Sequence, residues 1–538
     1  MSNLRLNYSK YFVSIEYIFS KYSNSEIYLE INRRNRPISE VNAILIIYKI
    51  LFKFLSRVAT RDLRARGYFA YPVVEDIMNI VLFWNNILLE CSRRDFTRGY
   101  ANSQQPGPIR TSRAMAIVHI AIHDAIAFKN GIPSAAYLNK KAISHTVAAA
   151  PAGVVDDIVA GAAVTTLKAM YPRYAAFIDD NHDGANNARF NYGEEIANAL
   201  LASRVNDGSD IMLTPPQVIS PVYSQHRADP FAPGQPRLGL AWGNVTRFTG
   251  NAHKPLAPHP GQSLPNLLTD PDYKADYDEV VEYGSADRRS RTAEQERIGV
   301  YWAYDGVMNL GVPPRLYNQI ARKIVADKSL SVARTAEVFA QVNVAMADAG
   351  IDAWHYKYLY DLWRPVVGVR AEVAPSGDPF WSPLGAPQTN VTGRSTFTPP
   401  FPAYPSGHAT FGAALFQSLR LALDTAASPM TTAEVMAEES GPGSGNAAET
   451  FTFVSDELDG IAFDSNGSVR QRVPVTYTNY ARPVWENSVS RIYLGVHWRF
   501  DGLPRDAADN IGGVPLGLAI GEEVHAFFNN GTSLGGSV

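Results

Sequence analysis

The chain has 538 residues, of which 46% are hydrophobic and 19% charged, with a formal net charge of −3 and a single cysteine, Cys91. This apolar fraction excludes a wholly disordered protein, and the length is enough for about two or three domain-sized units. One cysteine excludes a disulfide framework and cysteine-ligated zinc or iron–sulfur sites. The small net charge argues against a nucleic-acid partner bound through bulk electrostatics.

Basic residues are concentrated at the N-terminus. Residues 1–70 hold 12 of the 49 Lys and Arg residues but 5 of the 52 Asp and Glu residues, a balance of +7 that leaves −10 for the rest of the chain. We therefore treat residues 1–75 as a basic N-terminal extension with no assigned role. Its most apolar stretch, Ala43–Val58, is interrupted by basic residues, so it predicts an amphipathic helix and not a transmembrane segment. There is no clear signal peptide, and we expect a soluble protein whose secretion stays open.

Helical periodicity dominates the remainder, and strand-like alternation is scarce. Segments rich in Pro, Gly or Asp predict an irregular connection over 205–290, a loop over 371–405 and a surface excursion over 426–475. We predict an all-α protein of two helical bundles with long loop-rich connections. Residues 76–289 form the first bundle and its connection, and residues 290–538 form the second. The predicted helices are Ala114–Ala127, Asp156–Met170, Asn191–Arg204, Thr292–Tyr304, Pro314–Asp327, Ser331–Ala349, Asp352–Trp363, His408–Asp424, Trp485–Leu494 and Leu516–Asn529.

Two histidines lie on one face of the first of these helices. His119 and His123 are four residues apart, a spacing that can bind zinc. The stretch around them, VHIAIHDAIA, is almost wholly apolar and lacks the glutamate of a zinc-protease motif. We therefore expect both histidines to have a structural role in packing or hydrogen bonding.

Lys357 and Arg364 are seven residues apart in the segment KYLYDLWRP. Seven residues make nearly two full helical turns, so both cations would lie on one helix face before Pro365 ends or kinks the helix. Two cations on one face repel each other unless an anion lies between them. The pair therefore indicates an anion site, although the pattern also fits two long side chains on a solvated face.

The segment PSGH, residues 405–408, opens another predicted helix. Ser406 and Gly407 at a helix N-terminus leave a hydroxyl and backbone N–H groups free to bind an anion. His408 in the first turn would add a hydrogen-bond donor or an acid–base group. Taken alone, the segment also fits an ordinary serine N-cap followed by a surface histidine.

Arg491 and His497 lie in the segment SRIYLGVH. Arg491 offers a bidentate fork for an oxyanion. His497 is off the face of a straight helix, but Gly495 could end the helix and return the histidine to the site. A structural arginine with a half-buried histidine is the alternative. Together, the three segments supply three permanent cations, a helix N-terminus, a hydroxyl and two histidines, which suit a tetrahedral oxyanion of high charge.

With these motifs in the order K-x6-RP, PSGH and SR-x5-H, the sequence resembles the vanadium-dependent haloperoxidases of the type 2 phosphatidic-acid phosphatase superfamily. The longer segments FPAYPSGHATFG, SRIYLGVHWRFDG, YWAYDG, PPRLYNQI and DPFWSPLGAP are most similar to the fungal-type vanadium chloroperoxidases. The resemblance runs from about Leu82 to Gly517, and residues 1–75 have no recognised counterpart.

The resemblance implies a bound orthovanadate as the cofactor and no haem. His497 would bind vanadium through an imidazole nitrogen, and His408 would act as the acid–base group. Lys357 would also polarise bound hydrogen peroxide. The residues that would hold the vanadate oxygens are Lys357, Arg364, Ser406, Gly407 and Arg491.

Three further residues take a role from the same resemblance. Asp305, in YWAYDG, would pair with Arg491, which orients the guanidinium and offsets the clustering of cations. Trp354 and Phe401 would line the halide side of the site, and Phe401 in place of a polar residue is the chloroperoxidase-like choice.

The implied reaction oxidises chloride or bromide with hydrogen peroxide to hypohalous acid, which then halogenates a small organic acceptor. The alternative is a soluble acid phosphatase in which His497 is the nucleophile and His408 protonates the leaving group. A third possibility is an inactive anion-binding homologue, against which the complete set of motifs argues. No pattern in the sequence indicates an oligomeric state.

Overall fold

The computed structural model describes residues 79–97, 102–147, 149–182, 187–210, 224–261, 266–287, 290–371, 377–424, 426–530 and 534. They belong to one compact unit that runs from Asp76 to Val538. The basic extension predicted over residues 1–75, with its amphipathic segment Ala43–Val58, lies outside the described residues.

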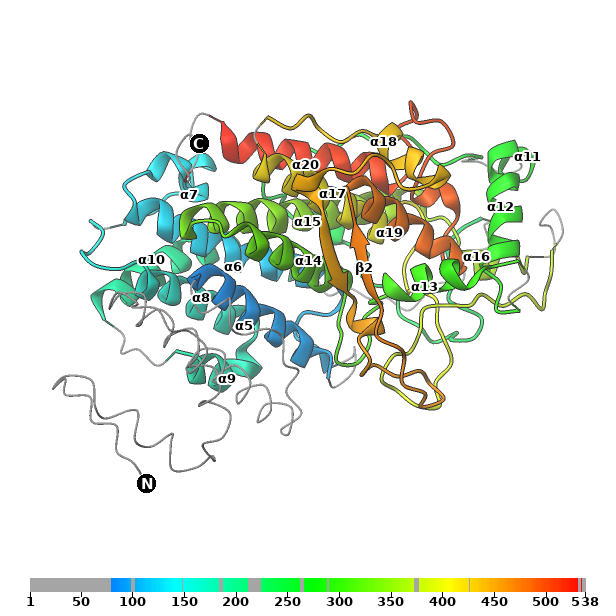
Figure 1. The fold of residues 1–538 in the computed structure, drawn as a ribbon, viewed down its shortest axis with the longest axis horizontal. Coiled ribbons are helices and arrows are strands. Elements are labelled where there is room, and N and C mark those ends of the chain that lie inside the picture. The colour runs from blue at the N-terminus through cyan, green and yellow to red at the C-terminus, as the bar shows by residue number, and fades with distance from the viewer. Residues whose placement is uncertain are drawn as a thin grey trace, which may run out of the picture. The chain divides into compact units, whose positions relative to one another are not determined.

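Helices dominate the described residues, which confirms the all-α prediction (Figure 1). None of the described helices combines the length and the apolar character that crossing a lipid bilayer requires. Strands β1 (Phe451–Val454) and β2 (Pro474–Tyr477) form an antiparallel pair in which Phe451 lies opposite Tyr477. The helices are α5 (Ile80–Asp95), α6 (Gly107–Lys129), α7 (Tyr137–Lys140), α8 (Asp156–Met170), α9 (Ala175–Asp180), α10 (Ala188–Ser203), α11 (Asn266–Thr269), α12 (Pro271–Tyr283), α13 (Ala293–Tyr301), α14 (Pro313–Lys328), α15 (Val332–Tyr360), α16 (Pro365–Gly368), α17 (Gly407–Leu423), α18 (Thr432–Ala437), α19 (Ala481–Tyr493) and α20 (Gly513–Asn529).

Helix α15 lies at the centre of the core, where it packs against α6, α17 and α20 (Figure 1). It is a single helix, whereas the sequence predicted two helices separated near Gly350. Packing explains the glycine, because a Cβ at Gly350 would lie 3.0 Å from the ring of Phe411 on α17. Gly350 therefore allows two helices to approach closely and does not interrupt α15. Helices α6 and α15 come from different predicted bundles, and the division at residues 289 and 290 stays a prediction.

Helix α12 lies inside the segment 205–290, which was predicted to be irregular. Pro271 is at the first helical position, where its missing N–H group has no helical partner to lose. The carboxylate of Asp270 accepts hydrogen bonds from the backbone N–H groups of Asp272 and Tyr273. The same proline and aspartates that suggested a loop therefore begin a helix, so the prediction was wrong here.

The prediction of a surface excursion over 426–475 is also wrong in part. Strand β1 leads into Ser455, Asp456 and Glu457, and all three residues are buried. The two carboxylates tolerate burial because each is paired: Asp456 with Arg315, and Glu457 with Arg470. Acidic residues suggested solvent exposure, but the partners that bury them are distant in the sequence.

His119 and His123 are both buried on α6. The Nε2 atom of His119 accepts a hydrogen bond of 2.9 Å from the Asn85 side-chain amide, and its ring stacks on Phe339. The Nδ1 atom of His123 lies 2.8 Å from the carboxylate of Asp124. Packing and hydrogen bonds therefore account for both side chains.

The burial of His119 should make the fold sensitive to acid. Burial lowers the pKa of His119 to about 3, so the folded protein resists protonation that the unfolded chain accepts near pH 6.5. Stability should therefore fall with decreasing pH below 6.5, by up to about 1.4 kcal/mol per pH unit from this residue. Urea unfolding of His119→Gln should show a shallower loss than the wild type between pH 6.5 and 4. Parallel pH profiles would show that His119 does not carry this effect.

Candidate active site

Segments that are distant in the sequence line one cavity of about 360 Å³. They include the C-terminal part of α15, the N-terminus of α17, the end of α19 with the loop after it, the loop after α13, and parts of the segments 235–238 and 388–401. Seven of the ten predicted site residues line the cavity: Asp305, Trp354, Phe401, Gly407, His408, Arg491 and His497. The other three, Lys357, Arg364 and Ser406, are not among the described residues that line it, and they are buried beside it.

His497 is held at both ring nitrogens. Its Nδ1 lies 2.7 Å from a carboxylate oxygen of Asp501, and its Nε2 lies 2.8 Å from Nη1 of Arg364. Because a guanidinium can only donate, Nε2 is the acceptor and the proton is on Nδ1, where it is donated to Asp501. Burial and the nearby Arg364 hold the pKa of His497 well below its usual value, so the ring is neutral. A neutral imidazole with a lone pair on Nε2 is the form that binds metals.

Gly495 explains how His497 reaches this position. Helix α19 ends at Tyr493, and Gly495 then adopts a φ of +69°, in the left-handed region that favours glycine. A Cβ at Gly495 would also lie 2.4 Å from the carbonyl oxygen of Gly284. Gly495 therefore follows the end of the helix and turns the chain back, as the sequence predicted.

Arg491 forms a bidentate ion pair with Asp305. The two guanidinium nitrogens Nη1 and Nη2 lie 3.0 Å and 2.8 Å from the two carboxylate oxygens, and both side chains are nearly fully buried. Burial raises the pKa of Asp305, and the Arg491 charge opposes that rise. Among the described residues, none accepts a hydrogen bond from Nε of Arg491. The ion pair thus orients the guanidinium and leaves its Nε without an acceptor among the described residues.

Arg364 is fully buried, and three of its contacts fix its guanidinium. Nε donates to the Phe401 carbonyl at 2.8 Å, and Nη1 donates to the Val496 carbonyl and to His497, each at 2.8 Å. The part of the chain that the structure describes offers Nη2 no acceptor. A buried guanidinium nitrogen without an acceptor is costly, and such an atom indicates a site for an anion.

Lys357 and Arg364 do not share a helix face, so this prediction was wrong. Helix α15 ends at Tyr360, Asp361 has a φ of +48°, and Arg364 precedes α16. Nζ of Lys357 donates to the carbonyl oxygens of residues 402, 403 and 405, at 2.8 Å, 3.0 Å and 2.5 Å. All three ammonium protons are therefore directed at the backbone that precedes α17. Burial, together with the Arg364 charge, lowers the pKa of Lys357 well below its usual value.

Ser406 and His408 form the N-terminus of α17. The Ser406 hydroxyl accepts a hydrogen bond from the Ala409 N–H group, which makes it the helix N-cap. Nε2 of His408 lies 2.7 Å from the Ala303 carbonyl oxygen and must carry the proton, because a carbonyl only accepts. Burial, with Arg491 nearby, lowers the pKa of His408 well below its usual value, so Nδ1 is left as an acceptor. His408 is thus a neutral base at the cavity wall.

Two aromatic rings form part of the cavity wall. The rings of Trp354 and Phe401 lie 4.8 Å apart between centroids, and the indole N–H group donates to the Leu238 carbonyl at 3.1 Å. Both guanidinium and ammonium groups approach this wall, since Arg364 and Lys357 lie 4.9 Å and 5.1 Å from the Phe401 ring centroid. The apolar surface of the cavity therefore lies directly beside the cations.

Sequence reasoning missed two groups that orient the histidines: the Asp501 carboxylate and the Ala303 carbonyl. Asp501 could have been found, because it follows His497 by four residues in the segment HWRFD. The Ala303 carbonyl carries no side-chain signal, and it lies 105 residues from His408 in the sequence.

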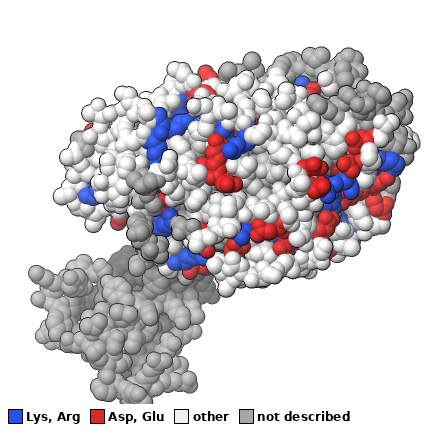
Figure 2. Space-filling view, turned by 90° about the horizontal axis from the view of Figure 1, so that it is seen from above, with Lys and Arg blue, Asp and Glu red and all other residues white. Residues whose placement is uncertain are grey.

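The three cations of the site are buried. Lys357, Arg364 and Arg491 are each 0% exposed, whereas on the face drawn in Figure 2 basic and acidic side chains are interspersed. Asp305 and Asp501 offset the internal cations. The near-neutral composition of the whole chain therefore conceals a buried cluster of three cations, which two carboxylates partly offset.

These donors fit a vanadate-sized oxyanion. The described residues contain no group of three or more His, Cys, Asp or Glu side chains that could hold a metal ion by chelation. They provide instead one imidazole lone pair, on His497, and two guanidinium N–H groups, on Arg364 and Arg491, that no described residue satisfies. A single nitrogen ligand combined with anion-binding donors suits a metal that brings its own oxygen ligands.

Comparisons with known proteins agree with this arrangement. Residues 74–190 match the family described as the vanadium chloroperoxidase N-terminal domain, and residues 337–531 match the VCPO second helical-bundle domain. The vanadium chloroperoxidase of Curvularia inaequalis is 32% identical over 572 aligned positions, which cover 84% of this chain and 90% of that protein.

Two solved structures show the same fold at low sequence identity. A bacterial vanadium-dependent iodoperoxidase is 17% identical, with a TM-score of 0.57 over 84% of this chain and 96% of that one. A bacterial vanadium-dependent chloroperoxidase in its holo form is 15% identical, with a TM-score of 0.52 over 79% and 93%. Because two domains of one family match, and a relative above 30% identity spans most of both chains, the chain belongs to the vanadium-dependent haloperoxidase family.

Proposed function

We propose that this protein is a vanadate-dependent haloperoxidase that uses hydrogen peroxide to oxidise chloride or bromide to hypohalous acid, which halogenates small organic acceptors. One observation carries the proposal. His497 is neutral and has its lone pair on Nε2, close to the buried guanidinium groups of Arg364 and Arg491. Each of these two groups has a nitrogen donor for which the described residues offer no acceptor.

Each residue has a defined task in this proposal. His497 would coordinate the metal through Nε2, which would give up its hydrogen bond from Nη1 of Arg364, while Asp501 keeps the proton on Nδ1. Arg364 would donate from Nη2, and Arg491 from Nε, to vanadate oxygens. Lys357 adds positive charge from behind the site, where backbone carbonyl groups hold its protons. Bound vanadate would supply the Lewis-acidic centre that activates hydrogen peroxide toward a halide.

The N-terminus of α17 would complete the oxygen contacts and move the proton. Gly407 lines the cavity at the first position of the helix, where backbone N–H groups are free of helical partners. The Ser406 hydroxyl accepts from the backbone and can still donate its own proton to an oxygen. Nδ1 of His408 would accept a proton from hydrogen peroxide and return it later.

The proposal of chloride or bromide as the substrate depends on the aromatic wall. Trp354 and Phe401 offer a halide an apolar surface beside the cations. The similar proteins carry names that include both a chloroperoxidase and an iodoperoxidase.

A paired assay tests the function. The protein is stripped of metal, and halogenation of an acceptor with hydrogen peroxide and chloride or bromide is measured with and without added vanadate. Release of phosphate from a generic ester is measured in parallel. We expect halogenation that depends on vanadate. Ester hydrolysis without vanadate and without halogenation would instead identify a phosphatase.

Replacing Phe401 with histidine should shift the halide preference. The imidazole replaces an apolar ring with a polar one beside the cations, and the resemblance gives the aromatic ring at this position as the chloroperoxidase-like choice. We expect Phe401→His to lower the chloride-to-bromide ratio of kcat/KM by about fivefold, which corresponds to about 1 kcal/mol. Phe397→His is the matched control, because Phe397 also lines the cavity, whereas the ring that contacts Trp354 on this wall is that of Phe401. An unchanged ratio would show that Phe401 does not determine the preference.

A further inference from the structure

Two groups of the site depend on one short turn, Ala303–Asp305, which follows α13. The Ala303 carbonyl accepts the hydrogen bond from Nε2 of His408 at 2.7 Å. The Asp305 carboxylate accepts both hydrogen bonds from Arg491. The position of this turn therefore sets the tautomer of the acid–base histidine and the orientation of an oxyanion-binding arginine.

Tyr304, between these two residues, has an unfavourable backbone conformation. Its φ of +43° lies in the left-handed region, which a bulky side chain adopts only at an energetic cost. Such a conformation persists only where the surroundings hold it firmly. The strained residue lies directly between Ala303 and Asp305, so whatever holds Tyr304 also holds both site contacts.

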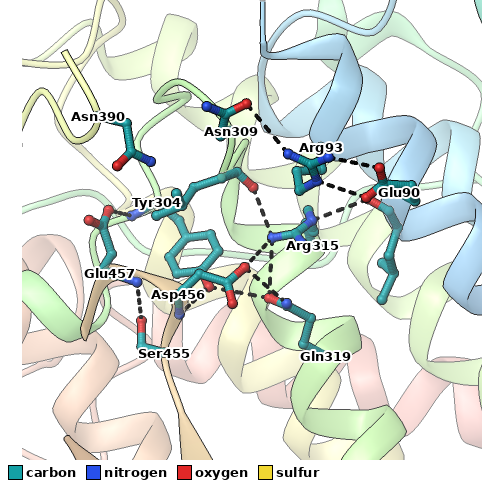
Figure 3. Close-up of polar contacts among 12 residues, drawn as sticks. Glu90, Arg93, Tyr304, Asn309, Arg315, Gln319, Asn390, Ser455, Asp456 and Glu457 are labelled. Atoms are coloured by element: carbon teal, nitrogen blue, oxygen red, sulfur yellow. Dashed lines mark hydrogen bonds and ion pairs between the residues drawn. The ribbon is translucent and has the colours of Figure 1, made fainter. Parts of the chain in front are cut away.

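The contacts that hold Tyr304 come from the segment after β1 and from α14. Its backbone N–H group donates to Oε1 of Glu457 at 3.1 Å. Its hydroxyl donates to Oε1 of Gln319 at 3.2 Å and accepts from the backbone N–H group of Asp456 at 2.8 Å. Figure 3 shows Tyr304 between these partners, with Glu457 at its backbone and Gln319 and Asp456 near its hydroxyl. Tyr304 is thus fixed at both of its ends.

Glu457 is itself tightly anchored. It is fully buried, and its second carboxylate oxygen accepts from the Thr389 hydroxyl and from Arg470. Two residues before Glu457, the Ser455 hydroxyl donates to the Tyr301 carbonyl at 2.7 Å. None of Ser455, Asp456 and Glu457 is among the described residues that line the cavity. Burying a carboxylate is costly, and Glu457 does not line the cavity. Contact with a ligand therefore does not explain why a carboxylate is buried here.

We propose that Glu457 and Tyr304 are positioning residues of the halogenation site. Glu457 holds the strained turn in place, and the turn in turn fixes the His408 ring through Ala303 and the Arg491 guanidinium through Asp305. The proposal rests on the proposed function, because it concerns how the same site binds vanadate and moves a proton. The segment 455–457 thereby acts on the site from outside the cavity.

Glu457→Ala tests the proposal against Asp464→Asn. Asp464 pairs with the other side of Arg470, and its side chain is 49% exposed, so the control alters the same arginine without touching Tyr304. Vanadate affinity is measured by equilibrium dialysis of the metal-free protein, and kcat at saturating vanadate, both well below the unfolding temperature of each variant. We expect Glu457→Ala to weaken vanadate affinity and to lower kcat by about tenfold each, the range seen for residues behind a metal site. Asp464→Asn should leave both values within about twofold.

Tyr304→Phe is the second variant and covers the case in which Glu457→Ala does not fold. It keeps the backbone contact to Glu457 and loses the two hydroxyl contacts, so we expect a weaker loss of affinity and of kcat, of about threefold. Folded variants with wild-type affinity and kcat would overturn the proposal, even if they unfold at lower temperature. Wild-type protein that neither binds vanadate nor halogenates would instead overturn the proposed function, so the two failures are distinguishable.

Discussion

His497→Ala should abolish vanadate retention. The variant removes the Nε2 lone pair, which is the one nitrogen ligand proposed for the metal, and leaves only hydrogen bonds and charge to hold an oxyanion. We expect vanadate affinity to fall by more than about 100-fold, beyond the 10- to 100-fold typical of residues that act behind a ligand. Halogenation should be lost with it. Equilibrium dialysis measures the affinity, and the halogenation assay at increasing vanadate shows whether saturation restores any rate.

Two variants serve as controls for this prediction. Asp501→Asn keeps the shape of the side chain that accepts from Nδ1 but removes its charge, so we expect an intermediate loss of affinity, of about tenfold. His145→Ala alters a histidine that bonds the Ile143 carbonyl and is not among the described cavity residues, and it should bind vanadate as the wild type does. If His497→Ala retains vanadate, another residue is the ligand.

The site could be predicted from the sequence where its residues are close together in the chain. The segments PSGH and SRIYLGVH each place their residues through one helix end, so local rules for caps and turns were sufficient for Ser406 and Gly495. Lys357 and Arg364 were predicted to share a helix face, but α15 ends between them at Tyr360. Periodicity assumes a continuous helix, and it has no means of placing a left-handed residue such as Asp361.

The unpredicted part of the fold depends on contacts between distant residues. Glu457 lies 153 residues from Tyr304, and the sequence around it, rich in acids and glycine, is typical of solvent-exposed loops. Its partners, which are Arg470, Thr389 and the backbone N–H group of Tyr304, make its burial tolerable, and no local pattern indicates them. The role of Gly350 was equally hard to predict, because it depends on the Phe411 ring, which lies on another helix. The helices were therefore more predictable than the packing that gives the site its shape.

His408→Ala should separate catalysis from vanadate binding. Nε2 of His408 bonds the Ala303 carbonyl, and the neutral ring leaves Nδ1 free to accept a proton. The loss of a general acid–base group lowers rates by about 10²- to 10⁴-fold, and we expect a fall in kcat of that size. Vanadate affinity should change by only a fewfold, because the proposed ligand His497 and the two arginines keep their own contacts. Steady-state halogenation at saturating vanadate measures kcat, and dialysis measures affinity.

His408→Gln distinguishes a proton-transfer role from a packing role. The glutamine amide can still donate to the Ala303 carbonyl, but it does not accept a proton near neutral pH. If His408 moves a proton, Gln should lose as much kcat as Ala while keeping the stability of the wild type. If the ring only supports α17 and the turn at Ala303, Gln should recover most of the rate that Ala loses. A variant with wild-type kcat would remove His408 from the proposed mechanism and leave the cavity without an acid–base group on this wall.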